Sequence, residues 1–264
     1  MKFKLLLGFF VFLIGCKQTN EYKTATNGVQ YQFLGQKNVG EKPKYGDIIS
    51  FQLKYGNDKT LLFDSYKNKQ PVFKQITRPA FFTSFERGLE LLAVGDSAVF
   101  VCSADSVFEL LLNTDRPTEI PAGSQLKFWV KMLEIRDENQ EIAQTLSRKG
   151  ITEKPDATGL ILVTTKPGKG PNASSGDSLT VHYRSFLLNG TEIENSYQSQ
   201  PLRFVLGMGS MIDAWEIALP KLNQGAKATI VCPSYLCYAA KRKDKIAPFT
   251  PLIFEIELLK IKKK

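Results

Sequence analysis

The chain alternates apolar and polar positions most clearly near its C-terminus. Residues 252–261 follow a proline-containing turn and alternate with a period of two, which predicts a half-buried β-strand. The pair Asn189-Gly190 predicts a tight hairpin turn between two such strands. Four further β-rich or alternating stretches in the same half of the chain predict strands over residues 159–165, 178–184, 202–206 and 226–233.

One segment in this half changes to a helical period. Apolar residues three or four apart predict a short amphipathic helix that contains Met211, Ile212, Trp215, Leu219 and Leu222. Asp213 and Glu216 have the spacing of a capping box at its start, and Thr83 with Glu86 repeats that spacing earlier in the chain. Several antiparallel strands with one short helix inserted late predict an α+β unit.

This pattern occurs twice along the chain. Residues 120–135 match residues 246–261 position for position (246 − 120 = 126), and Gly46 matches Gly176 (176 − 46 = 130). The offset stays at 130 as far as Phe108 and Tyr238 and then falls to 126, so the second copy is four residues shorter in one loop. Agreement of this kind predicts a duplication, and a length of 264 residues suits two domains. The offset of 130 also pairs Asp64 with Glu194, Phe85 with Trp215, Leu89 with Leu219, Gly95 with Gly225 and Cys102 with Cys232.

The composition is that of a globular protein, with 43% hydrophobic and 23% charged residues and a formal net charge of +9. The positive charge has two interpretations, a solvated surface or an attraction to anionic lipid or nucleic acid. The lysines are scattered, and neither an aromatic-interleaved basic stripe nor a zinc-ligand spacing occurs. We therefore favour a solvated surface and expect no nucleic-acid partner.

The first residues have the pattern of an export signal. A basic start is followed by an apolar run of about eleven residues, which is shorter than the ~20 that a transmembrane helix needs. The run Leu13-Ile14-Gly15-Cys16 resembles a bacterial lipobox, which implies cleavage before Cys16 and acylation of its thiol. The alternative is a plain signal peptide in which Cys16 has no special role. By analogy, Lys17 after the cysteine favours the outer membrane, with the protein facing the periplasm.

The organisation that we expect follows from these boundaries. It comprises a signal peptide at 1–15, a lipid-anchored tether at 16–27, a first domain at 28–136, a partly helical linker at 137–157 and a second domain at 158–264.

The remaining cysteines and the one histidine suggest no metal or cofactor. Cys102 and Cys232 occupy matching places in apolar strands, so we expect both in the cores. A disulfide between Cys232 and Cys237 remains open, because its geometry does not follow from spacing. His182 has no Cys or carboxylate neighbours at ligand spacing, so a structural role is expected.

The second half of the chain resembles a known family. The motifs are V-H-Y (181–183), E-N-S (194–196), P-L-R-F-V-L-G-M-G-S-M-I-D-A-W-E (201–216), C-P-S-Y-L-C-Y (232–238) and the closing I-A-P-F-T-P-L-I-F-E-I-E-L-L. In order and spacing they resemble an FKBP-type peptidyl-prolyl cis-trans isomerase, and the first half matches more loosely. The resemblance implies an α+β fold of two tandem domains, each a five-stranded antiparallel sheet wrapped around one short helix.

The resemblance also implies a site in the second domain. Trp215 would form the floor of an apolar cleft, and the Tyr238 hydroxyl would donate to the substrate carbonyl. Glu194 stands where the family usually has Asp, and Ile193 where it usually has Phe. The catalytic residues implied are Tyr183, Glu194 and Tyr238, and the substrate-binding residues are Ile193, Phe204, Met211, Ile212, Trp215, Ile246 and Phe254.

The first domain departs from this pattern. Leu53 replaces Tyr183, Phe85 replaces the tryptophan and Phe108 replaces the tyrosine that carries the donor hydroxyl, although the pair Phe63-Asp64 is retained. We therefore expect this domain to be weakly active or only binding.

Such a site needs no nucleophile. Peptide-bond rotation has a barrier of about 18–20 kcal/mol that comes from amide resonance, and a cleft that binds the twisted amide better than the planar one lowers it. We expect an isomerase that acts on Pro-containing segments of cell-envelope proteins. Two alternatives remain, a non-catalytic chaperone or adaptor that holds such segments in its grooves, and a purely structural lipoprotein.

Overall fold

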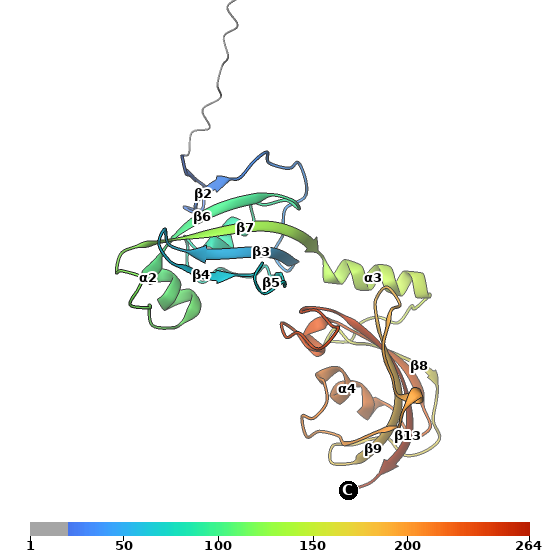
Figure 1. Cartoon of the computed structure of the whole chain (residues 1–264). Helices are drawn as coiled ribbons and strands as arrows, with labels where there is room; N and C mark the ends of the chain where they lie inside the picture. The colour runs from blue at the N-terminus through green and yellow to red at the C-terminus, as the bar shows by residue number, and fades with distance from the viewer. Residues whose placement is uncertain (1–20) are drawn as a thin grey trace, which may run out of the picture.

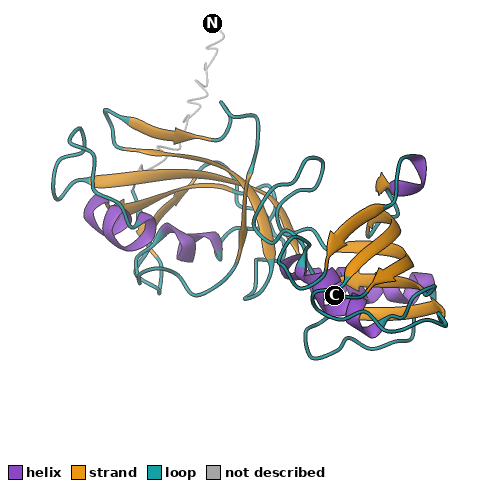
Figure 2. Ribbon diagram, turned by 90° about the horizontal axis from the view of Figure 1, so that it is seen from below, coloured by secondary structure: helices purple, strands orange, loops and turns teal. Residues whose placement is uncertain are grey.

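The structure is a computed structural model that describes residues 21–264, so the expected signal peptide, Cys16 and Lys17 lie outside the described residues. The described chain forms two antiparallel sheets, each with its own hydrophobic core, which are separated by helix α3 (Figures 1 and 2). We call residues 21–136 the N-terminal unit and residues 158–264 the C-terminal unit. Among the described helices, none is long and apolar enough to cross a membrane.

The C-terminal unit is a six-stranded sheet that curves around helix α4 (Figure 1). Its strands lie in the order β10-β9-β13-β12-β8, and β11 also pairs with β9. Gly190 closes the predicted hairpin turn after β9 with a φ of 91°, a left-handed conformation that glycine adopts without strain. The strands are β8 (Ile161–Lys166), β9 (Ser178–Leu187), β10 (Glu192–Asn195), β11 (Leu202–Val205), β12 (Lys227–Cys232) and β13 (Leu252–Lys262).

The apolar positions of these strands face α4 (Asp213–Ala218). Leu179 and Val181 of β9 and Ile256 and Leu258 of β13 are buried in one core with Trp215 of α4. Successive side chains of a strand point to opposite faces of the sheet, so the alternation in the sequence places one row of side chains on the helix and the other row on the outer face.

The N-terminal unit has the same order of main strands. Its sheet runs β1-β2-β6-β7-β3-β4, and β5 also pairs with β3. Strands β2, β6, β7, β3, β4 and β5 thus occupy the places of β8, β12, β13, β9, β10 and β11. The strands are β1 (Lys23–Thr24), β2 (Gln30–Phe33), β3 (Ile48–Gly56), β4 (Leu61–Asp64), β5 (Val72–Gln75), β6 (Ser97–Ser103) and β7 (Gln125–Arg136).

The expected count of five strands per sheet is too low, and the register explains why. Strand β9 is ten residues long, so β10 pairs with its later part around residues 184–186 while β11 pairs with residues 178–181. Two short strands therefore share one edge position. The same happens with β4 and β5 along β3, and β1 adds a further strand beside β2.

The short helices begin differently from the capping-box prediction. Ser84, not Thr83, caps α1 (Phe85–Leu89), and Ile212 precedes α4 without a side-chain hydrogen bond. The predicted capping residue Glu216 instead accepts a hydrogen bond from the Gly207 N–H at 2.7 Å, because the loop before the helix folds back over it. The other short helices are α2 (Ala104–Ser106), the π-helix η1 (Val107–Leu112) and the 3₁₀ turns η2 (Ser196–Gln198), η3 (Leu219–Lys221) and η4 (Ser234–Leu236).

Helix α3 (Glu138–Lys149) fills most of the segment between the units (Figure 1). Its buried Ile142 packs on the outer face of the C-terminal sheet, in a small cluster with Ile161, Val231 and Ile253. The helix covers residues 138–149 of the segment that was expected to be a partly helical linker, and it is docked on the C-terminal unit.

Candidate functional site

A cleft of about 570 Å³ opens beside the start of α4 in the C-terminal unit. Strands β9, β10 and β13 supply one side, and η4 with the segment after it supplies the other. The cleft brings together seven of the ten residues that the sequence nominates, namely Tyr183, Glu194, Met211, Ile212, Trp215, Tyr238 and Phe254.

Aromatic rings form the base of this cleft. The ring of Trp215 is packed edge-on against Tyr183 and Phe254, with centroids 5.0 and 5.6 Å apart, and is tilted against Phe204 at 5.9 Å. Edge-on contacts of this kind stabilise aromatic clusters beyond their buried area. Trp215 is only 3% exposed, and its Nε1 has no hydrogen-bond partner among the described residues.

Two tyrosine hydroxyls lie at the polar side of the cleft. The Tyr183 hydroxyl donates to Glu194 Oε2 at 2.8 Å, and burial together with this carboxylate raises the pKa of Tyr183 to about 12. Burial and then the charge of Glu194 also raise the pKa of Tyr238. Both hydroxyls are therefore neutral donors at pH 7, and the structure records no partner for the Tyr238 hydroxyl within the described chain.

The other three nominated residues, Phe204, Ile246 and Ile193, are not among those that line the cleft. Phe204 and Ile246 are buried in the core at 8% and 5% exposure, where they support the lining side chains. Ile193 falls at an irregularity in the pairing of β10 with β9 and packs against the same core. All three therefore belong to the core around Trp215, and Phe204 touches the Trp215 ring directly.

Sequence reasoning missed several lining residues, most of them in η4 and the segment after it. Tyr235, Cys237, Lys241 and Lys243 all face the cleft, although the lysines looked like part of an ordinary surface loop. The sequence feature that could have identified them is that they lie within a few residues of Tyr238 along the chain. Cys237 and the buried Cys232 are free thiols whose sulfurs are 2.9 Å apart, and burial raises the pKa of Cys232.

Strand register corrects one of the matches between the two halves. Asp64 lies opposite β3 at the place where Asn195 lies opposite β9, and a pairing irregularity precedes both. Each accepts a hydrogen bond from the backbone N–H two residues further on, at 2.9 and 3.0 Å. Phe63, not Asp64, therefore occupies the place of Glu194, and the offset in this strand is 131 (194 − 63).

The N-terminal unit has apolar side chains at the places of the polar site residues. Leu53, Phe85 and Phe108 are 6–7% exposed. Phe85 is stacked nearly parallel on Phe128, with centroids 4.4 Å apart, where the C-terminal unit has an edge-on pair. None of these side chains, nor Phe63, can donate or accept a hydrogen bond, so the groups at the places of Tyr183, Glu194 and Tyr238 are all apolar. The hydroxyl-bearing Tyr55 stacks on Phe63 and Phe128 in the same cluster, with centroids 5.8 and 5.1 Å apart.

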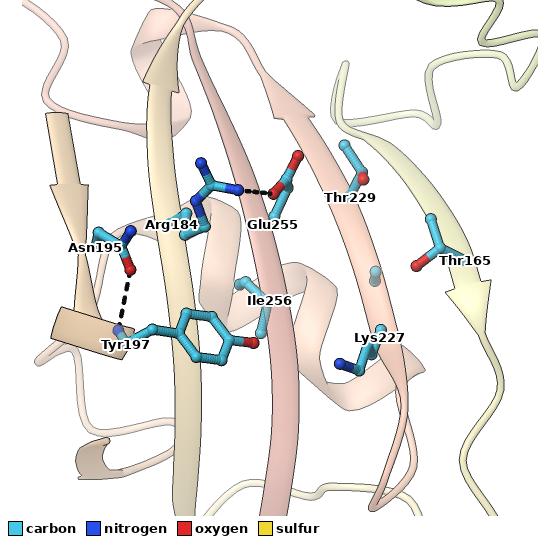
Figure 3. A pocket seen from close by; sticks show the side chains of 9 residues that line it. Thr165, Arg184, Asn195, Tyr197, Lys227, Thr229, Glu255 and Ile256 are labelled. Atoms are coloured by element: carbon cyan, nitrogen blue, oxygen red, sulfur yellow. Dashed lines mark hydrogen bonds and ion pairs between the residues drawn. The ribbon is translucent and has the colours of Figure 1, made fainter. Parts of the chain in front are cut away.

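A second depression lies on the opposite face of the C-terminal sheet (Figure 3). Arg184 there pairs with Glu255 and Glu192, and the Tyr197 hydroxyl donates to Glu257 at 2.9 Å. It contains none of the nominated site residues. Its charged groups are held in ion pairs, and Lys227 pairs with Glu257 at 3.0 Å, so the cleft beside α4 remains the candidate site.

The structure places a short helix inside a curved antiparallel sheet, beside an aromatic cleft with a tyrosine hydroxyl. This is the arrangement that the resemblance to the FKBP-type isomerases implies. The family model described as FKBP-type peptidyl-prolyl cis-trans isomerase matches residues 170–259. The chain belongs to this family, which confirms the resemblance.

Two related proteins and one solved structure show how much of this chain is similar to known proteins. An FK506-binding protein of Neisseria meningitidis is 38% identical over 105 residues, which are 39% of this chain and 96% of that protein. The FKBP-type peptidyl-prolyl cis-trans isomerase FkpA of Escherichia coli is 34% identical over 43% of this chain and 41% of its own length. A peptidyl-prolyl cis-trans isomerase structure from Pseudomonas syringae is 35% identical, covering 48% of this chain and 91% of that chain with a TM-score of 0.42.

The chain covers only part of several relatives, including 26% of the FK506-binding protein 4 of Emericella nidulans. The likeness to E. coli FkpA likewise spans less than half of either chain.

Proposed function

We propose that the C-terminal unit catalyses cis-trans isomerisation of X-Pro bonds in its cleft. The observation that carries this proposal is the unpartnered Tyr238 hydroxyl beside the apolar floor of Trp215. An X-Pro amide that loses planarity also loses charge separation, so an apolar floor favours the twisted state. A hydroxyl aimed at the substrate carbonyl adds a hydrogen bond that can be stronger in that state.

We propose in addition that the N-terminal unit is a duplicated copy that binds but does not catalyse. The shared strand order supports a common origin, and the loss of hydrogen-bonding groups at Leu53, Phe63 and Phe108 supports the loss of catalysis. Its exposed Phe82 and Leu110 leave apolar surface for contact with an extended chain.

We further propose that the protein is lipid-anchored through Cys16 in a bacterial cell envelope, with residues 1–15 removed and 16–27 as a tether. Its substrates would then be Pro-containing segments of envelope proteins. The sequence pattern before Cys16 supports this location. Metabolic labelling with a radioactive fatty acid should mark the wild-type chain and leave Cys16→Ser unlabelled.

The decisive experiment is a proline-peptide isomerase assay on the full chain. Tyr238→Phe should lower kcat/KM about tenfold, as expected for one hydrogen bond of ~1.4 kcal/mol. Tyr197→Phe makes the same chemical change on the opposite face of the sheet and should leave the rate unchanged. Equal rates for wild type and Tyr238→Phe would refute the assignment of the donor.

An inactive but folded wild-type chain would favour the alternative of a non-catalytic chaperone or adaptor. Suppression of aggregation of an unfolded client, retained in Tyr238→Phe, would then identify that function.

A further inference from the structure

The segment that carries Tyr238 has an unusual backbone. Of the five non-glycine residues with positive φ in the described chain, three lie here: Ala239, Asp244 and Phe249, with φ between 47° and 54°. Such conformations are costly for residues with a Cβ and persist only where the surroundings fix them. We call residues 234–250 the cleft segment, since it contributes one wall of the cleft.

The start of the cleft segment is fixed by a residue from between the units. Glu138, the first residue of α3, accepts from the Ser234 backbone N–H at 2.7 Å and from the Ser234 hydroxyl at 2.6 Å. Ser234 is 3% exposed, and its carbonyl accepts from the N–H groups of Cys237 and Ala239 at 3.0 and 2.8 Å. A shift of Ser234 would therefore also shift Cys237 and Ala239, the residues on both sides of Tyr238.

The end of the cleft segment is fixed by the neighbouring strand of the N-terminal unit. Arg136, the last residue of β7, donates to the Phe249 carbonyl at 3.2 Å and to Glu141 of α3 at the same distance. The Phe249 N–H in turn donates to the Ala239 carbonyl at 2.6 Å. Across the units, the guanidinium of Arg242 lies 5.8 Å from the ring centre of Phe73.

Helix α3, which carries Glu138 and Glu141, is itself held in place. Ile142 anchors it on the outer face of the C-terminal sheet, and Asp137 caps its first turn by accepting from the Gln140 N–H. Figure 1 shows α3 between the two sheets, beside the part of the C-terminal unit that is nearest to the N-terminal unit. Because α3 is docked on the sheet, the Glu138 carboxylate at its start can hold the strained cleft segment in one position.

We propose that Glu138 is a positioning residue for the Tyr238 hydroxyl, with Arg136 fixing the other end of the cleft segment. The junction between the two units thereby sets the geometry of the cleft. This inference rests on the proposed isomerase function, because the hydroxyl matters only if it acts on a substrate. Positioning errors of about an ångström are enough to reduce a rate substantially.

The first test measures isomerase kinetics of the full chain. Glu138→Ala should lower kcat about tenfold with little change in KM, and Glu138→Gln should recover most of the rate because its amide oxygen can still accept from Ser234. In a Tyr238→Phe background, Glu138→Ala should cost less than about twofold. The matched control is Glu153→Ala, an exposed glutamate of the same connecting segment, which should behave as wild type.

The second test does not depend on activity. Hydrogen exchange of the full chain, followed by mass spectrometry of peptides within the cleft segment, should be about tenfold faster in Glu138→Ala and unchanged in Glu153→Ala. If the wild-type chain lacks isomerase activity but exchange is still faster in Glu138→Ala, the proposed function is refuted and the positioning contact is retained. Unchanged exchange, or an equal loss of rate in both Tyr238 backgrounds, would overturn the role of Glu138.

Discussion

Helix α3 is expected to stabilise the C-terminal unit selectively, and Ile142→Ala tests this. Ile142 is 7% exposed and packs on Ile161, Val231 and Ile253, each at most 1% exposed. Replacing a buried isoleucine by alanine costs about 2–5 kcal/mol. Since the site lies at a helix–sheet contact near the surface and can relax, we expect about 2–3 kcal/mol.

The two tryptophans of the chain make the assay specific, because Trp129 lies in β7 and Trp215 in α4. Urea unfolding is followed by fluorescence in Trp129→Phe and Trp215→Phe backgrounds, so that each background reports one unit. With a urea dependence of about 2 kcal/mol/M, the midpoint reported by Trp215 should fall by about 1 M. The midpoint reported by Trp129 should stay in place.

Gln140→Ala is the control, since it removes an exposed side chain from the same helix. A loss below about 0.5 kcal/mol for Ile142→Ala, typical of surface substitutions, would refute the docking of α3. Equal shifts of both midpoints would show instead that the two units unfold as one.

Three further predictions concern other sites. Gly88→Ala would place a Cβ 2.3 Å from the buried Phe100 ring, so the midpoint reported by Trp129 should fall, with a loss of about 2 kcal/mol or more. The pKa of Tyr183 is raised from 10.0 to about 12, so the neutral Tyr183 hydroxyl stabilises the fold below pH 10, and this stabilisation is lost as the pH rises towards 12. The free energy of unfolding, measured across this range, should fall less steeply in Tyr183→Phe than in the wild type. A disulfide reagent should first form a mixed disulfide with the half-buried Cys237, and the Cys232 thiol should then displace the reagent's thiol and close a Cys232–Cys237 disulfide. Mass spectrometry that found the first adduct on Cys232 would contradict this order.

The strands of the C-terminal unit were predictable because their alternation is strong. Strand β13 begins at Leu252 as predicted and ends one residue beyond the predicted Ile261. The error at Phe63 and Asp64 arose because a pairing irregularity shifts register by one residue without changing the composition of the strand. For the same reason, the number of strands on one edge could not be read from the sequence.

The site was predictable only in part. The family motifs identified Tyr183, Trp215 and Tyr238, which the structure brings to one cleft. The cleft segment has no periodic pattern, and its conformation depends on Glu138 and Arg136, which are 96 and 113 residues distant from their partners in the chain. Contacts at such separations leave no local signal in a single sequence.

The central position of β13 has a consequence for the order in which the protein folds. This strand lies between β9 and β12, yet it is the last strand of its sheet to be synthesised. The N-terminal unit has all of its strands once residue 136 has been made, so it can fold while the rest of the chain is still being extended. The C-terminal sheet stays split until residues 252–262 arrive, which leaves the edges of β9 and β12 open to pairing with other chains. A partner or chaperone that protects the nascent protein would therefore act on these two edges.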